Sequence, residues 1–124
     1  MTIERFMTAN PHTIGRDLTL TVAHELMRKH GVRHLPVLHG GKLVGVLSQR
    51  DLYFLETFKD VEQDKVTVEE AMTPDPFIVE LTAKLGDVAR TMADHKYGAA
   101  IVVESGKVVG IFTAIDALHA LTAA

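Results

Sequence analysis

The first half of this chain contains a stretch of apolar residues at helical spacing, followed by two short continuous apolar runs. Leu20, Ala23 and Met27 stand at helical spacing, and two apolar runs, at 35–38 and 43–47, follow them. The spacing predicts an amphipathic helix that Gly31 ends as a C-cap, and the runs predict two strands. His39-Gly40-Gly41-Lys42 between the runs favours a tight hairpin turn, because two glycines tolerate the positive φ angles that such a turn requires.

The second half repeats this order of a helically spaced stretch followed by two apolar runs. Its predicted elements are an extended segment at 77–79, a helix around 85–92, strands in the apolar runs at 100–103 and 108–112, and a closing helix at 114–121. Glu104-Ser105-Gly106-Lys107 separates the two runs. The extended segment matches one at 12–14 in the first copy, and the closing helix matches one at 49–58. Each copy is therefore predicted to be β-α-β-β-α.

A shift of 65 residues aligns the two copies without a gap. Between residues 7 and 55 this alignment gives twelve identities, where random pairing gives roughly three. The identical pairs are Met7/Met72, Thr8/Thr73, Pro11/Pro76, Leu20/Leu85, Met27/Met92, His30/His95, Val37/Val102, Gly41/Gly106, Lys42/Lys107, Val44/Val109, Gly45/Gly110 and Asp51/Asp116. The chain is an internal duplication.

The duplication predicts an α/β (α+β) fold. The hairpin strands are apolar on both faces, as in strands covered by helices, and one copy is too small to fold alone. We expect the copies to pack sheet to sheet about a pseudo-two-fold axis, with two equivalent clefts between them. The expected boundaries are repeat 1 at 1–58, a polar linker at 59–69 and repeat 2 at 70–124.

A short motif closes each hairpin, Gly45-Val46-Leu47-Ser48-Gln49-Arg50-Asp51 in one copy and Gly110-Ile111-Phe112-Thr113-Ala114-Ile115-Asp116 in the other. A hydroxyl residue followed three positions later by an acid is a capping box, worth about 1 kcal/mol without any ligand. The same helix start can instead bind phosphate through free N–H groups, while a carboxylate accepts ribose hydroxyls. Both interpretations stay open, and the recurrence of the motif favours function.

Composition narrows the classes of function. The net charge of −3 argues against general nucleic-acid binding. The sequence lacks cysteine and contains no apolar run of the roughly 20 residues that a membrane span needs. We therefore expect a cytoplasmic protein. Charge is uneven, +2 over residues 1–58 and −5 over residues 59–124, which biases where an anion binds.

The tandem arrangement resembles a pair of CBS domains, also called a Bateman module. The resemblance rests on Met-Thr-x-x-Pro at 7–11 and 72–76, on Gly31-Val32-Arg33-His34-Leu35-Pro36-Val37, and on the two Gly-to-Asp motifs. It implies a regulatory module that binds an adenosine-containing ligand, such as AMP, ADP, ATP, S-adenosylmethionine or NAD(H), with no required cofactor. It also implies a homodimer.

The resemblance assigns roles to individual residues. It implies that Asp51 and Asp116 hold the ribose hydroxyls and that Ser48 and Thr113 contact sugar or phosphate. The Asp51 cleft would use the Phe77-Ile78-Val79 and Tyr97-Gly98-Ala99 segments for the base, and the Asp116 cleft would use Thr13-Ile14-Gly15 and Val32-Arg33-His34. The implied nucleotide-binding residues are Ser48, Asp51, Thr113, Asp116, Arg33, His34, Thr13, Ile14, Ile78, Val79 and Ala99.

The second repeat departs from this pattern. Gly98 and Ala99 replace Arg33 and His34, so a phosphate at that segment finds no positive charge. Arg50 partly compensates near Asp51, whereas Ile115 cannot do so near Asp116. We expect the two clefts to bind differently.

We find no catalytic constellation and expect no enzyme activity. We also expect no metal site, because Gly31 interrupts the helix between His30 and His34 and no third ligand is grouped with them.

The main hypothesis is a ligand sensor that acts on an unidentified regulated protein. The alternatives are a structural dimerisation module without a ligand, and a regulatory fragment whose catalytic domain lies on another chain. Met1 directly before the first repeat suggests a free-standing protein, although a fragment would look the same.

Overall fold

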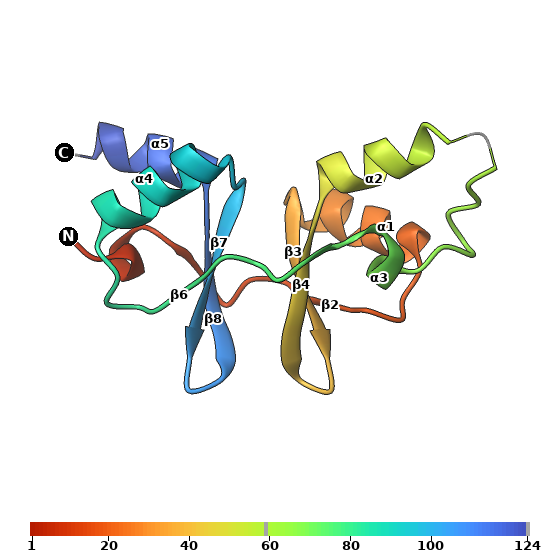
Figure 1. Cartoon of the computed structure of the whole chain (residues 1–124), viewed down its shortest axis with the longest axis horizontal. Helices are drawn as coiled ribbons and strands as arrows, with labels where there is room; N and C mark the ends of the chain where they lie inside the picture. The colour runs from red at the N-terminus through yellow and green to blue at the C-terminus, as the bar shows by residue number, and fades with distance from the viewer. Residues whose placement is uncertain (59, 124) are drawn as a thin grey trace. The chain divides into compact units, whose positions relative to one another are not determined.

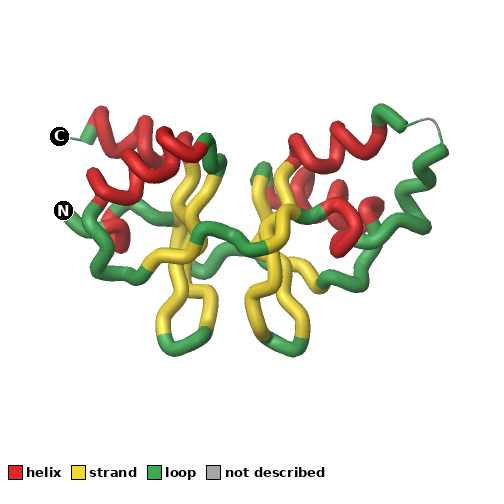
Figure 2. The backbone as a smooth tube through the Cα atoms, in the orientation of Figure 1, coloured by secondary structure: helices red, strands yellow, loops and turns green. Residues whose placement is uncertain are grey.

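The computed structural model describes residues 1–58 and 60–123, and it divides into two compact units (Figures 1 and 2). Lys59 and Ala124, at the start of the expected linker and the end of the second repeat, lie outside the described residues. Unit 1 comprises residues 1–11 and 77–124, and unit 2 comprises residues 12–76.

Unit 2 is one four-stranded sheet with helices. Its elements are β2 (Ile14–Gly15), α1 (Leu20–His30), β3 (His34–His39), β4 (Lys42–Ser48), α2 (Gln49–Glu56), α3 (Val68–Ala71) and β5 (Thr73–Pro74). The strand order is β2-β3-β4-β5, with β2 parallel to β3 and the other pairs antiparallel. Gly40 and Gly41 both have positive φ, which confirms the predicted hairpin turn, and Gly31 ends α1 in the left-handed conformation.

Unit 1 has the same plan. Its elements are η1 (Ile3–Arg5), β1 (Thr8–Ala9), β6 (Ile78–Val79), α4 (Leu85–His95), β7 (Ala99–Glu104), β8 (Lys107–Thr113) and α5 (Ala114–Thr122). The strand order is β1-β8-β7-β6. The β-α-β-β-α order of both copies is therefore confirmed.

The compact units do not coincide with the sequence repeats, because each repeat's opening segment packs on the other repeat. β1 pairs with β8 in unit 1, and β5 pairs with β4 in unit 2. In Figure 1 the red N-terminal segment accordingly runs beside the blue strands of unit 1, and the green α3 lies beside α1 of unit 2.

Matching backbone hydrogen bonds hold the two exchanged segments, which are residues 1–11 in unit 1 and the stretch from α3 to β5 in unit 2. The N–H of Ile3 donates to the carbonyl of Ala83, and the N–H of Val68 donates to the carbonyl of Leu18, both at 2.8 Å. Ile3 and Val68 stand 65 residues apart and both are fully buried. The duplication therefore extends to the first residues of the chain, and the expected linker lies within unit 2.

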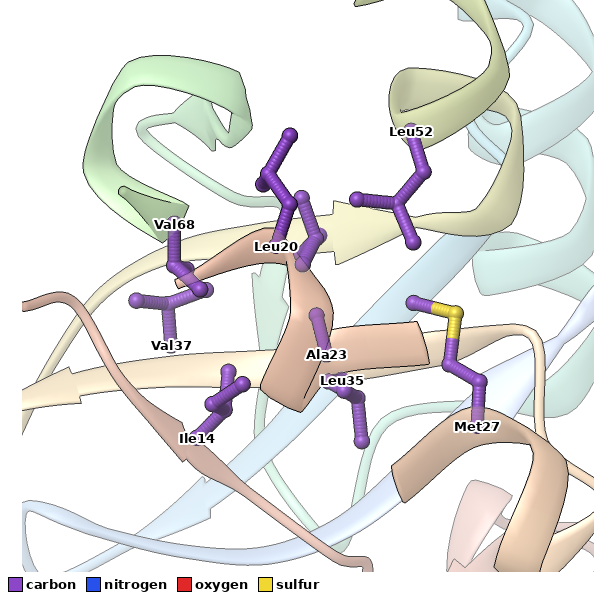
Figure 3. Close-up of a cluster of buried hydrophobic side chains, with 9 residues drawn as sticks. Ile14, Leu20, Ala23, Met27, Leu35, Val37, Leu52 and Val68 are labelled. Carbon is purple, nitrogen blue, oxygen red and sulfur yellow. The ribbon is translucent and has the colours of Figure 1, made fainter. Parts of the chain in front are cut away.

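Each unit has its own hydrophobic core. In unit 2 the buried side chains come from the strands, from one face of α1, from α2 and from the exchanged α3 (Figure 3): Ile14, Leu20, Ala23, Met27, Leu35, Val37, Leu47, Leu52 and Val68. In unit 1 they are Ile3, Val88, Met92, Ala100, Val102 and Phe112. The exchanged residues Ile3 and Val68 are thus core residues of the unit that they join.

The glycine of each Gly-to-Asp motif is required by a methionine of the exchanged segment. A Cβ placed on Gly45 would lie 2.5 Å from Sδ of Met72 and 2.9 Å from the carbonyl oxygen of Thr73. Met7 covers Gly110 in the same way. Met7/Met72 and Gly45/Gly110 are two of the twelve identical pairs, so packing accounts for two of those identities.

We therefore expect Gly45→Ala to lower the free energy of unfolding by about 1–3 kcal/mol, because the added methyl group meets both a side chain and a backbone oxygen. Chemical denaturation measures this change. Gly86→Ala is the matched control, since a Cβ there meets nothing within 4 Å. The loss in the double variant Gly45→Ala/Met72→Ala should be smaller than the sum of the two single losses, because the two side chains compete for one space. No loss at Gly45→Ala would contradict the packing described.

Candidate functional site

The two helix starts that carry the Ser/Thr–Asp motifs are complete capping boxes. In unit 2 the Asp51 N–H donates to Oγ of Ser48, and the Ser48 N–H donates to Oδ2 of Asp51, both at 3.0 Å. In unit 1 the Asp116 N–H donates to Oγ1 of Thr113 at 3.3 Å, and the Thr113 N–H donates to Oδ2 of Asp116 at 2.9 Å. The capping interpretation of the motif is therefore confirmed.

Most free N–H groups of these helix starts already have partners. The N–H of Gln49 donates to the carbonyl of Arg33 at 2.8 Å, and the N–H of Ala114 donates to the carbonyl of Gly98 at 3.2 Å. In the described part of the chain, the amides of Arg50 and Ile115 remain without a partner in the first turn. Each helix start therefore offers one N–H to an anion rather than the several that a phosphate nest would provide.

The carboxylates keep one oxygen for another partner. Oδ2 of Asp51 and Oδ2 of Asp116 accept the capping bonds, while Oδ1 of either residue accepts no hydrogen bond from the described residues. Both aspartates are half-buried. Since an ionised carboxylate accepts several hydrogen bonds, each can cap its helix and also accept a hydroxyl from a ligand.

In unit 2 the sheet brings other predicted residues close to this helix start. His34 lies directly opposite Ser48 in the β3–β4 register, and the exposed Arg33 precedes it. Thr13 precedes β2, which pairs with β3 at Ile14–Val37. Ile14 itself is 3% exposed and its side chain belongs to the core (Figure 3), so it offers a ligand its backbone rather than its side chain.

Unit 1 gathers the equivalent residues with different chemistry. Ala99 lies directly opposite Thr113 in the β7–β8 register and is almost fully buried. Ile78 and Val79 form β6 at the edge of β7, and Ile78 is 52% exposed. The basic residues of unit 2 thus have small, uncharged counterparts. The expected partnership of Asp51 with residues 77–79 and 97–99 joins different units and stays a prediction, as does that of Asp116 with residues 13–15 and 32–34.

Each unit has an aromatic contact at the residue where the chain enters it, His12 in unit 2 and Phe77 in unit 1, and sequence reasoning missed both contacts. In unit 2 the rings of His12 and His30 stack, with centroids 3.5 Å apart. At the equivalent place in unit 1, Phe77 contacts Tyr97 with centroids 5.3 Å apart, and Tyr97 stacks on His95. The signal that could have revealed them is the alignment itself, which pairs residue 12 with 77 and residue 30 with 95.

The His12–His30 stack changes the acidity of His30. Desolvation lowers the pKa of the His30 imidazole, and positive charge on His12 and Lys29 lowers it further. Among the described residues no three His, Asp or Glu side chains gather as a metal-ligand set. Nor does any helix of residues 1–58 and 60–123 have the length and hydropathy that crossing a bilayer requires.

A comparison with protein-family models identifies the two repeats. The model described as CBS domain matches residues 3–55 and 68–123. Among curated proteins, the inosine-5'-monophosphate dehydrogenase of Korarchaeum cryptofilum (strain OPF8) is 34% identical over 117 residues, which are 94% of this chain and 23% of that enzyme. The chain spans less than a quarter of the length of this and two further curated enzymes that it matches.

Solved structures share the whole fold. CBSX2 in complex with AMP is 30% identical, with a TM-score of 0.86 over 98% of this chain and 97% of that one. The CBS domain pair of protein MJ0100, in complex with 5'-methylthioadenosine and S-adenosyl-L-methionine, is 26% identical, with a TM-score of 0.89 over 99% and 97%. These likenesses confirm the predicted α/β fold of two CBS repeats.

The lowered pKa of His30 predicts a pH-dependent contribution to stability. The unfolded chain binds the proton more readily than the folded one, so this contribution is complete above the ordinary histidine pKa of about 6.5 and decreases as the pH falls through it. The melting temperature of the wild type minus that of His30→Asn should therefore decrease between pH 7 and pH 5.

His39→Asn, at the exposed hairpin end, is the control for general effects of acid. NMR titration of His12→Ala provides a second measurement, since the pKa of His30 should rise toward its ordinary value once His12 is removed. A melting difference that stays constant or widens toward acid would argue against this role of the stack.

Proposed function

Because this chain belongs to the CBS domain family, we propose that it is a regulatory sensor that binds an adenosine-containing ligand. The observation that carries this proposal is the free Oδ1 of each capping aspartate, which leaves a hydroxyl acceptor at the start of α2 and of α5. Two structures similar to this chain support the ligand class, one in complex with AMP and the other with two adenosyl compounds.

The proposed contacts follow from the geometry of the helix starts. The ribose hydroxyls donate to Oδ1 of Asp51 or Asp116, and the capping bonds through Oδ2 stay in place. Ser48 and Thr113 lie beside the sugar. In the Asp51 site a phosphate would be bound by the N–H and the guanidinium of Arg50, and in the Asp116 site by the Arg33 guanidinium. Charge-assisted hydrogen bonds of this kind are stronger than neutral ones.

The two sites are proposed to differ in affinity for charged ligands. Arg33, His34 and Arg50 correspond to Gly98, Ala99 and Ile115, so three polar or basic side chains have uncharged counterparts. A ligand whose affinity depends on phosphate should therefore distinguish the two sites. A ligand without phosphate, such as an adenosyl thioether, depends mainly on the ribose contact that both sites share.

We propose that ligand binding acts by shifting an equilibrium between two arrangements of the protein, or of its complex with a regulated partner, in the cytoplasm. This role needs no chemistry on the chain itself, and we propose no catalytic activity. The similar enzymes are far longer than this chain, so their reactions are not extended to it.

A second function, that of a dimerisation module without a ligand, is favoured by two observations. The capping boxes are complete in themselves, and large apolar side chains are exposed on the closing helices. These are Tyr53, Phe54 and Phe58 at α2, and Ile115, Leu118 and Leu121 on α5. Phe54 and Phe58 also contact each other edge to face, with centroids 5.5 Å apart. We propose that these helices associate with a second copy of the chain, whether or not a ligand binds.

The sensor proposal predicts that at least one of AMP, ATP, S-adenosylmethionine and NADH raises the melting temperature. At a ligand concentration 100 times the Kd, the stabilisation is about 2.7 kcal/mol. Asp51→Asn and Asp116→Asn separate the two roles of each carboxylate. Asparagine keeps an oxygen for the capping bond but presents an amide donor to the ribose hydroxyls. Each variant should therefore melt close to the wild type alone and lose the ligand response of its own site.

Asp17→Asn, on an exposed loop, is the control variant. Unequal effects of the two substitutions on ATP binding would support the difference between the sites. Absence of any ligand response would leave the dimerisation module as the function, and a response that survives both substitutions together would refute the assigned site.

The dimerisation proposal predicts a molecular mass of twice that of the chain in light scattering after size exclusion. Phe54→Lys and Leu118→Lys place a charge on the exposed apolar faces and should each shift the protein toward monomer. His39→Lys, on the exposed hairpin, should leave the mass unchanged. A monomeric wild type at micromolar concentration would contradict this part of the proposal.

A further inference from the structure

A polar cavity of about 320 Å³, open to solvent and lined mostly by exposed residues, lies on unit 2 away from the capping boxes. Four lining residues come from α1, one from the last position of α2, and one from the segment that follows: Thr21, His24, Glu25, Arg28, Glu56 and Gln63. Its volume is at the lower end of the range for small-molecule sites, roughly 300–1,000 Å³. Glu56 lies seven residues after Gln49, so the cavity is roughly 10 Å along α2 from the helix start.

Hydrogen bonds fix the walls of this cavity. Nε2 of His24 and Oε1 of Glu56 are hydrogen-bonded, and their side chains are only 22% and 25% exposed. The N–H of Thr21 donates to the carbonyl of Gln63 at 3.2 Å, which ties the segment after α2 to the first turn of α1. The cavity is therefore bounded by elements held to one another.

The lining residues present charges of both signs. Glu25 and Arg28 form no ion pair with any of the described residues, and the Glu56 carboxylate faces the same cavity. A simple anion would meet two carboxylates, and a simple cation would meet the Arg28 guanidinium. A ligand that carries both charges can satisfy both kinds of group. None of the described lining residues is apolar, which favours a ligand with a short, polar side chain.

We propose that this cavity binds a small polar α-amino acid. Its carboxylate would be bound by Arg28, its ammonium group by Glu25 and Glu56, and its side chain by Thr21 and Gln63. Arginine suits the first of these contacts because its planar guanidinium matches a carboxylate with two hydrogen bonds.

The other repeat shows that the fold itself does not require these residues. At the positions equivalent to Thr21, His24, Glu25, Arg28 and Glu56, unit 1 has Gly86, Ala89, Arg90, Ala93 and Leu121. The two units nevertheless share the same elements. The polar set is a feature of unit 2 alone, which is the pattern expected of a binding site added to a duplicated scaffold.

The test is calorimetric titration and thermal melting of the full chain with glycine, serine, aspartate, glutamate and glutamine. Acetate and ethylamine are the single-charge controls. We expect one or more of the amino acids to raise the melting temperature at millimolar concentration, with neither acetate nor ethylamine doing so. Arg28→Met and Glu25→Gln should each weaken binding at least tenfold, whereas Arg90→Met in unit 1 should not.

Three outcomes would overturn the proposal: no response to any amino acid, an equal response in Arg28→Met, or an equal response to acetate alone. Arg28→Met is expected to bind adenosine ligands as the wild type does. Failure at this cavity is therefore distinguishable from failure of the proposed sensor site.

Discussion

The structure depends on an exchange between its two repeats. Neither repeat completes its own sheet and core, because the residues that close each unit come from the start of the other repeat. Ile3 and Val68 are fully buried in the units that receive them, and Met7 and Met72 cover glycines on β8 and β4. Each motif glycine lies on the strand that leads into its capping box. The exchange therefore positions the strand ends from which the candidate site is built.

In the proposed sensor, one group of atoms in each capping box serves both folding and binding. A helix start with all its donors free would bind an anion well but would stabilise the fold less. In this protein the cap and the carbonyl of the residue before β3 or β7 satisfy most donors, and among the described residues one N–H and one carboxylate oxygen remain at each helix start. That set suits a sugar hydroxyl better than a phosphate. Phosphate affinity must then come from side chains such as Arg33 and Arg50, the part in which the repeats differ.

Sequence reasoning predicted the local structure of each repeat because local signals specify it. Helical spacing defined α1, the Gly40-Gly41 pair defined a hairpin turn, and the Ser48–Asp51 spacing defined a capping box. The exchange was missed because it joins residues far apart in the chain, from 27 positions for Gly45 with Met72 to 103 for Met7 with Gly110. No local pattern encodes such a contact. The polar cavity was missed for the same reason, since His24 and Glu56 meet only after α1 and α2 pack.

In the proposed sensor, Asp51 and Asp116 accept ligand hydroxyls through the oxygen that the cap leaves free. NMR observation of the side-chain carboxyl carbons during titration with AMP tests it most directly. The carboxyl resonance of at least one of these aspartates should shift as AMP binds, while the amides of both stay protected by their capping bonds. Binding of AMP that leaves both carboxyl resonances unchanged, or that releases the capped amides to exchange, would contradict it.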